Sequence, residues 1–183
     1  MVDFSTKHTA AQKLLFLSNE GQDISLCSFN VIELMGSNSI KNKRISYLIA
    51  GFALKGNEQI LFLVPNIFKK DLTNIHLHSA ASIAINCVAT LMNENIAEFV
   101  AKDVPPLYTC SKPIIRKKVS LLSLKLFINN TDCVSTLVPL LADRIKDPQV
   151  GVQISAVTAI LEISKINPKL FLVTIPHLFE VLD

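Results

Sequence analysis

The sequence predicts an all-α protein, a right-handed α-solenoid of about ten helices arranged as antiparallel pairs. A short motif recurs, in which a β-branched aliphatic residue precedes a proline and a large aliphatic residue follows two places after it. The four copies contain Pro65, Pro105, Pro139 and Pro176, spaced 40, 34 and 37 residues apart. Half of the 183 residues are hydrophobic whereas only 5 are glycine, which leaves little room for the tight turns of a β-meander. Self-similarity with a period of about 20 to 50 residues is typical of stacked helix pairs, which serve mainly as binding scaffolds.

The expected helices form one continuous segment over residues 1–183 and are joined by short connections, which makes neighbours antiparallel. The recurrent prolines lie inside the first helix of each pair and are expected to kink it, because a proline removes one intrahelical hydrogen bond. In chain order the expected helices span residues 7–18, 24–35, 40–54, 58–71, 75–92, 96–109, 113–128, 132–146, 148–165 and 168–182.

Capping residues support several of these boundaries. Asp147 before Pro148, and Asn167 before Pro168, are each expected to be an N-cap followed by a proline at the first helical position. The sequence from Asn95 to Glu98 fits a capping box with Asn95 as the N-cap. The glycines expected to end helices in the left-handed conformation are Gly21, Gly36 and Gly56.

The helix expected at 148–165 has two apolar stripes and is therefore predicted to pack on both sides. One stripe is Val150, Ile154, Val157 and Leu161, and the other is Val152, Ala156, Ile160 and Ile163. The helix expected at 113–128 carries Val119, Leu122 and Leu126 at positions 35 residues upstream of Ile154, Val157 and Leu161. This interpretation places Leu161 in a buried seam, so Leu161→Asp is expected to unfold the array.

Several functional classes find little support. A net charge of +3 is too small to indicate nucleic-acid binding, and no aromatic residues interleave with the basic clusters, which are interpreted as a solvated face. The four cysteines, Cys27, Cys87, Cys110 and Cys133, contain no C-x-x-C pair and are expected to be reduced thiols of a cytosolic protein. The longest strongly apolar stretch, from Ser79 to Met92, is shorter than the about 20 residues that span a bilayer.

No catalytic residue, cofactor or metal site is expected. His76 and His78 could be a metal pair on a strand, but on a helix residues two apart point in nearly opposite directions, so they are interpreted as solvated. Gly51 and Gly56 have the spacing of a phosphate loop, yet Asn57 stands where the lysine would be, and a helix end explains Gly56 better.

The unit around Pro139 resembles a HEAT repeat. Ile115-Arg116 stands in the preceding unit where that family usually has Val-Arg, and Gly151 takes the place of the arginine in the next unit. The family's ladder of Asp–Arg contacts is therefore expected to be interrupted. The matching residues are Leu137-Val138-Pro139-Leu140-Leu141, then Asp147-Pro148 and Val150, then Ala156 and Leu161.

A second resemblance covers nearly the whole chain. Six blocks follow one another in the order found in the trunk of large adaptins: Ser28–Met35, Lys43–Leu48, Ile67–Leu72, Lys112–Val119, Asp147–Gln153 and Asn167–Lys169. Among adaptins the chain is most similar to the delta class of the third adaptor-protein complex. Since adaptin trunks run to many more repeats, the resemblance implies that residues 1–183 are a fragment of such a trunk.

The resemblance also implies a function. Adaptin trunks are non-enzymatic scaffolds that hold sigma-type and beta-type subunits in a heterotetramer. As part of a coat, the complex is peripheral on Golgi and endosomal membranes and sorts proteins towards lysosome-type organelles. An Arf-type GTPase is a further partner, although its usual contact helices precede this chain. In related alpha-adaptins the stretch matching Lys7 to Leu15 binds phosphoinositide, so Lys7 and Lys13 are the candidate lipid or partner contacts. The alternatives are another large adaptin (gamma, epsilon or alpha) or a general HEAT scaffold.

Overall fold

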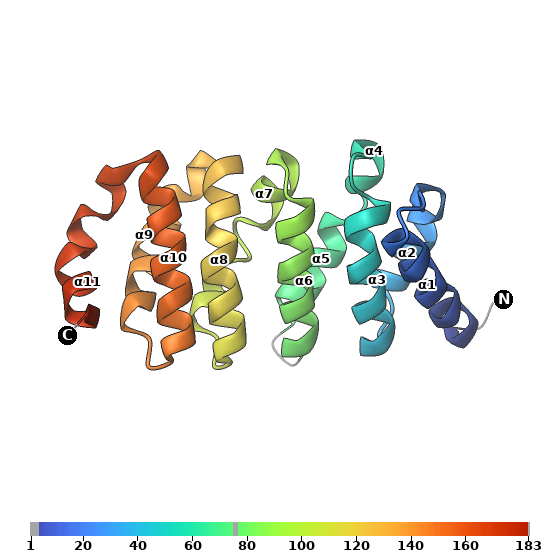
Figure 1. Cartoon of the computed structure of the whole chain (residues 1–183), viewed down its shortest axis with the longest axis horizontal. Coiled ribbons are helices and arrows are strands. Elements are labelled where there is room, and N and C mark those ends of the chain that lie inside the picture. The colour runs from blue at the N-terminus through green and yellow to red at the C-terminus, as the bar shows by residue number, and fades with distance from the viewer. Residues whose placement is uncertain (1–3, 75–76, 183) are drawn as a thin grey trace. The chain divides into compact units, whose positions relative to one another are not determined.

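The computed structural model describes residues 4–74 and 77–182, and every regular element in these ranges is a helix (Figure 1). The chain forms two compact units, Met1–Leu91 and Met92–Asp183. In each unit a layer of long, uninterrupted helices packs against a second layer of short helical segments. We call these the long-helix layer and the segmented layer.

The long-helix layer of the first unit consists of α1 (Phe4–Asn19), α3 (Ile40–Ala53) and α6 (His78–Leu91). Its segmented layer consists of η1 (Ser25–Cys27), α2 (Ser28–Met35), α4 (Glu58–Leu61) and α5 (Pro65–Leu72). Helix α3 is central, since it packs against α1, α2 and α6, while α5 packs against α6. Fully buried Met35, Ile49 and Phe68 fill the space between the two layers.

The long-helix layer of the second unit consists of α8 (Pro113–Asn129) and α10 (Val150–Ile166), which pack along each other. Its segmented layer comprises α7 (Glu94–Val100), η2 (Pro105–Thr109), η3 (Thr131–Cys133), α9 (Val134–Asp143), η4 (Arg144–Lys146), η5 (Pro168–Thr174) and α11 (Ile175–Leu182). Helix α9 contacts both α8 and α10, and Figure 1 shows it partly behind α10.

The sequence predicts the long helices far better than the segmented ones. The expected helices at 7–18, 40–54, 113–128 and 148–165 match α1, α3, α8 and α10 to within three residues at either end. The expected helix at 75–92 corresponds to α6, although residues 75 and 76 lie outside the described part of the chain. In contrast, the expected helices at 24–35, 58–71, 96–109, 132–146 and 168–182 are each broken into two or three segments.

The recurrent prolines explain much of this segmentation, and the prediction that all four kink a helix is wrong. Only Pro139 lies in a helix interior, in α9. Pro65 and Pro105 each begin a new segment, and Pro176 is the second residue of α11. A proline has no amide to donate, so it fits the first turn, where no intrahelical partner exists. At Pro65 the new segment starts with the Val64 carbonyl, which accepts from the amides of Ile67 and Phe68 at 2.9 and 3.1 Å.

Two of the expected N-caps are wrong and one is confirmed. Helix α7 begins at Glu94, and its cap is Asn93, whose Oδ1 accepts from the Ile96 amide at 2.9 Å, rather than Asn95. Helix α10 begins at Val150, so Asp147 is not its N-cap. The Asp147 carboxylate instead accepts hydrogen bonds from the Gln149 amide and from Arg116. Asn167 is the N-cap of η5, where its Oδ1 accepts from the Lys169 amide at 3.3 Å.

Two of the three expected left-handed glycines are confirmed. Gly21 and Gly56 have φ angles of 80° and 82°, which a residue with a Cβ rarely adopts. Gly36 follows α2, as expected, but has an ordinary right-handed φ of −69°. Gly51 serves a different purpose, because a Cβ there would lie 3.1 Å from Thr90 Cγ2, so the glycine lets α3 and α6 come close together.

Helix α10 is buried through one stripe only, which corrects the expectation that it packs on both sides. The stripe of Val152, Ala156, Ile160 and Ile163 is buried, whereas Val150, Ile154 and Leu161 are 64%, 60% and 57% exposed. The expected offset of 35 residues between matching core positions of α8 and α10 is also wrong. Helices α8 and α10 both have 17 residues and their starts are 37 apart, so Val119, Leu122 and Leu126 correspond to the buried Ala156, Ala159 and Ile163.

The exposure of Leu161 reverses the expected effect of a charge at that position. Leu161→Asp should change the free energy of unfolding by about 0.5 kcal/mol or less, because the side chain lies largely in water. Leu126→Ala, at a fully buried position of the neighbouring helix, should lower it by roughly 2–5 kcal/mol. Equilibrium urea unfolding of the two variants provides the measurement. A loss for Leu161→Asp as large as that for Leu126→Ala would show that Leu161 is buried.

Candidate protein-binding faces and the ion pairs beneath them

A buried ion pair joins the two layers of the first unit. Lys43, the fourth residue of α3, donates to both carboxylate oxygens of Asp71 at 2.8 and 2.6 Å and to the Met35 carbonyl at 2.9 Å. The hydroxyl of Tyr47 donates to Asp71 Oδ2 at 2.6 Å. The side chains of Lys43 and Asp71 are only 4% and 2% exposed. This network uses all three ammonium protons and ties α3 to the ends of α2 and α5.

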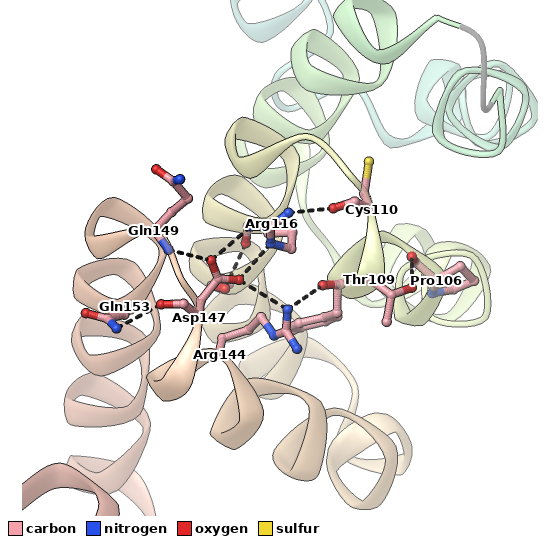
Figure 2. A network of polar contacts seen from close by, with 10 residues as sticks. Pro106, Thr109, Cys110, Arg116, Arg144, Asp147, Gln149 and Gln153 are labelled. Atoms are coloured by element: carbon pink, nitrogen blue, oxygen red, sulfur yellow. Dashed lines mark hydrogen bonds and ion pairs between the residues drawn. The ribbon is translucent and has the colours of Figure 1, made fainter. Parts of the chain in front are cut away.

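The second unit has a corresponding pair (Figure 2). Arg116, the fourth residue of α8, binds Asp147 in a bidentate fashion, with Nε to Oδ2 at 2.7 Å and Nη2 to Oδ1 at 2.9 Å. Its Nη1 donates to the Cys110 carbonyl at 2.7 Å. Arg144 adds a further contact from Nη1 to Asp147 Oδ2 at 3.2 Å and bonds the Tyr108 carbonyl at 3.1 Å. The Asp147 carboxylate thus holds α8 and the start of α10 together.

The same helix position recurs in other long helices. Lys7, fourth in α1, forms an ion pair with Glu33 of α2. Gln153, fourth in α10, donates from Nε2 to the Asp147 carbonyl at 2.8 Å. The residue that replaces the family arginine is therefore Gln153 rather than Gly151, which corrects the alignment expected from sequence. Ala81 holds this position in α6 and cannot form an ion pair. The ladder of Asp–Arg contacts is therefore interrupted at α6 as well as at α10.

The pKa shifts of the buried groups follow from these contacts. Hydrogen bonds from Arg116 hold the pKa of Asp147 below its ordinary value, and the pKa of Arg116 is raised in turn. Burial raises the pKa of Tyr47, and it raises those of Tyr108 and Cys87 to about 12. At neutral pH, Asp147 is therefore charged while the two tyrosines and the thiol are neutral, which suits structural roles.

The surface of the long-helix layer differs in charge from the rest of the chain. The described residues of α1, α3, α6, α8 and α10 contain ten lysines and arginines but a single acid, Glu162, and Glu162 bonds Lys165 at 2.7 Å. Acidic residues lie instead in the segmented layers and loops, as Glu33, Asp71, Glu98 and Asp147 do. The long helices also expose large aliphatic and aromatic side chains, among them Leu48, Phe52, Ile114, Leu121, Ile154 and Leu161.

Hollows lie along the long-helix layer in the described part of the first unit, and three of them bear on binding. A hollow of about 720 Å³ between α3 and α6 is lined by Tyr47, Leu48, Phe52, Lys55, Asn86 and Thr90, among others. A second, of about 450 Å³, lies between α1 and α3, with His8, Lys41 and Arg44 in its lining. The third, of about 400 Å³, is bounded by α1, α2 and α3 and is mostly apolar.

The two candidate lipid-contact lysines both line the third hollow. Lys13 is exposed, whereas the ammonium of Lys7 is held by Glu33. Of the histidine pair, His76 lies outside the described residues and His78 begins α6. All four cysteines are thiols. Within the described residues, no three His, Cys, Asp or Glu side chains gather as a metal site would require, and no helix is both long and apolar enough to cross a bilayer.

Comparison with known proteins places this geometry in a family. Residues 2–183 match the family model described as the adaptin N terminal region. AP-3 complex subunit delta-1 from Bos taurus is 31% identical over 180 residues, which cover 98% of this chain and 15% of that protein. AP-3 complex subunit delta from Schizosaccharomyces pombe is 33% identical over 180 residues, and the protein of the same name from Saccharomyces cerevisiae is 30% identical over 182. The chain spans 22% and 20% of those two relatives' lengths.

The fold has a counterpart among solved structures. A homology model of the full-length AP-3 complex in an intermediate open conformation superposes with a TM-score of 0.84 and 30% sequence identity. The match covers 98% of this chain and 32% of the other. It confirms the predicted α-solenoid class and the resemblance to a delta-class adaptin trunk.

The lowered pKa of Asp147 predicts how stability depends on pH. Its carboxylate contributes stability that is present above the unfolded-state value of 3.8 and is lost as the pH falls through the lower folded-state pKa. Stability should therefore fall below about pH 4. Asp147→Asn should remove this part of the pH dependence and cost roughly 3–5 kcal/mol at pH 7, because Arg116 is left buried without its partner. Urea unfolding across a pH series measures both effects.

The matched control for this prediction is Asp143→Asn, an exposed acid four residues away. It should leave the stability at pH 7 nearly unchanged. Parallel pH profiles for the wild-type chain and Asp147→Asn would contradict the assigned role of Asp147.

Proposed function

Because the chain belongs to the adaptin N-terminal family, we propose that it is a non-enzymatic scaffold segment of a delta-like large subunit in a vesicle-coat adaptor complex. One structural observation supports this role: the long-helix layers are fixed from behind by buried ion pairs, yet they present large apolar side chains to solvent. Such side chains are costly to leave exposed unless they bind another surface. The complex would act in protein sorting and vesicle transport.

The proposed partners are the sigma-type and beta-type subunits of the same complex, held on the long-helix faces. Several relatives are named as subunits of an AP-3 complex, and the structural neighbour represents that complex. This supports assembly with other adaptor subunits. Membrane association would then be peripheral, through the complex, at Golgi or endosomal membranes on the way to lysosome-type organelles. An Arf-type GTPase is a further candidate partner.

The long-helix faces predict which substitutions abolish partner binding. Leu121→Asp combined with Ile154→Asp should reduce recovery of a sigma-type or beta-type adaptin in a pull-down by about tenfold or more, because each aspartate places a charge in an apolar contact. Both side chains are exposed, so the variant should fold. Mass spectrometry of the recovered proteins provides the measurement.

A matched control lies in the segmented layer of the same unit. Leu172→Asp with Ile175→Asp also replaces two exposed aliphatic residues and should leave recovery unchanged. If the wild-type chain recovers only partners of other HEAT scaffolds, such as Ran-type GTPases or phosphatase subunits, the adaptor role is wrong. Recovery of the subunits of another adaptor complex would favour another adaptin class.

Lys7 and Lys13 remain the proposed contacts for a phosphoinositide headgroup. Because Glu33 already holds Lys7, most of any binding should depend on Lys13. Lys13→Glu is expected to weaken sedimentation with phosphoinositide-containing vesicles by about tenfold, since each lysine near an anionic surface contributes about 1 kcal/mol. Lys102→Glu, an exposed lysine of the second unit, is the control. Equal losses for the two variants would refute a site at Lys13.

A further inference from the structure

The second unit presents a continuous mixed surface on α8 and α10, which we call the α8–α10 face. On α8 its residues recur at intervals of three and four, so they form one line along the helix. On α10, which packs beside α8, exposed residues recur at the same intervals and form a second line. The α8–α10 face consists of Ile114, Lys117, Leu121, Lys125 and Ile128 on α8, and of Ile154, Thr158, Leu161 and Lys165 on α10, all exposed.

The two lines lie on the same side of the unit. Helices α8 and α10 pack along each other, and α9 contacts both of them. Figure 1 shows α9 partly behind α10. The residues that α8 and α10 bury, including Val119, Leu126 and Ala156, face these contacts, so the exposed lines point away from α9. From Ile114 to Ile128 the α8 line is about 21 Å long, which is the length of about four helical turns.

The charge of the α8–α10 face has one sign after internal pairing is considered. Arg116 is neutralised by Asp147 beneath the face, and Glu162 beside the α10 line is bonded to Lys165. Lys117 and Lys125 are the remaining charges of the α8 line, and α8 contains no acid to balance them. Each of these lysines stands between aliphatic residues of the α8 line, with Leu121 between the two. A complementary partner must therefore bury aliphatic side chains and place carboxylates next to them.

We propose that the α8–α10 face binds an amphipathic α-helix of a protein partner, about four turns long, whose apolar stripe is flanked by Asp or Glu residues. The proposal rests on the scaffold function proposed above and specifies the chemistry of one partner element. The apolar stripe would pack on Ile114, Leu121, Ile128, Ile154 and Leu161. Its carboxylates would meet Lys117 and Lys125 between the apolar residues of the α8 line, which makes binding sensitive to salt.

The spacing of the lysines favours a helix over a lipid surface. A segment that lies in a membrane interface keeps its charges on the face opposite its apolar one. Here Lys117 and Lys125 alternate with the apolar residues, so inserting Leu121 into a bilayer would draw both ammonium groups towards the hydrocarbon. A single-stranded nucleic acid is disfavoured as well, because the α8–α10 face offers only aliphatic residues where stacking would need aromatic ones.

The test uses the whole 183-residue chain and two synthetic fluorescent peptides of about 14 residues. Both peptides have leucines at helical spacing of three and four, and they differ only in that one carries Glu and the other Lys at the flanking positions. Fluorescence anisotropy gives their affinities at about 50 mM and about 300 mM salt. The Glu peptide should bind at least about tenfold more tightly than the Lys peptide at low salt, and most of this difference should vanish at high salt.

Charge reversal locates the site. Lys117→Glu with Lys125→Glu should weaken the Glu peptide by about tenfold or more and strengthen the Lys peptide. Lys102→Glu with Lys146→Glu changes the net charge equally, at exposed lysines of the same unit outside the face, and should change affinity by less than about twofold. The proposal is overturned if the two peptides bind alike, if both double variants lose affinity equally, or if anionic vesicles compete with the Glu peptide as well as excess unlabelled peptide does.

The same variants separate this inference from the proposed function. If the wild-type chain recovers adaptin subunits and Lys117→Glu with Lys125→Glu recovers them equally well at every salt concentration, the scaffold function stands and the charged contact is wrong. If the wild-type chain recovers no adaptin subunit yet binds the Glu peptide through Lys117 and Lys125, the adaptor role fails and the chemistry of the face is supported.

Discussion

The arrangement of both units depends on one interaction, a buried ion pair between the fourth residue of a long helix and an aspartate that follows in the segmented layer. In the first unit the pair is Lys43 with Asp71, and in the second it is Arg116 with Asp147. A buried ion pair is no guarantee of net stability, because desolvation opposes the attraction between the charges. Its effect is to fix register: a shift of one layer against the other by one residue would leave an aspartate and a cation buried without partners, at several kcal/mol for each.

This fixed register determines which faces of the long helices remain open. The cation at the fourth position turns inward, so the buried stripe of α8 follows it at Val119, Leu122 and Leu126, and the line through Ile114, Lys117 and Leu121 turns outward. Helix α10 repeats the arrangement 37 residues later with Gln153 in place of the arginine. Because the acids serve the pairs from the segmented layer, the long helices keep an almost purely basic surface. Segregation of charge and exposure of apolar groups therefore follow from a single packing scheme.

Much of this could be predicted from the sequence, and the errors have physical causes. Periodicity located the long helices, because their cores repeat Val, Leu and Ile over four or more turns. It could not tell which of two apolar stripes on α10 is buried. Ile154 and Leu161 look as suitable as Ala156 and Ile160, and only the packing of α10 against α8 and α9 decides. The segmented layer was missed because a proline inside an apolar run fits a kinked helix as well as a new start, and Pro65 and Pro139 adopt different solutions. The basic character of the long helices can be recognised only once it is known which helices share a layer.

The position of a pair in the layer also determines how strongly it acts. Lys7 and Glu33 occupy the same places as Lys43 and Asp71, but their side chains are 25% and 55% exposed instead of 4% and 2%. Water screens the first pair, so its contribution belongs with surface ion pairs, at about 0–1 kcal/mol. The pair at α1 thus keeps the geometry of the repeat without its rigidity. The side of α1 that bears Lys7 is consequently held less firmly against its segmented layer than α3 is by Lys43.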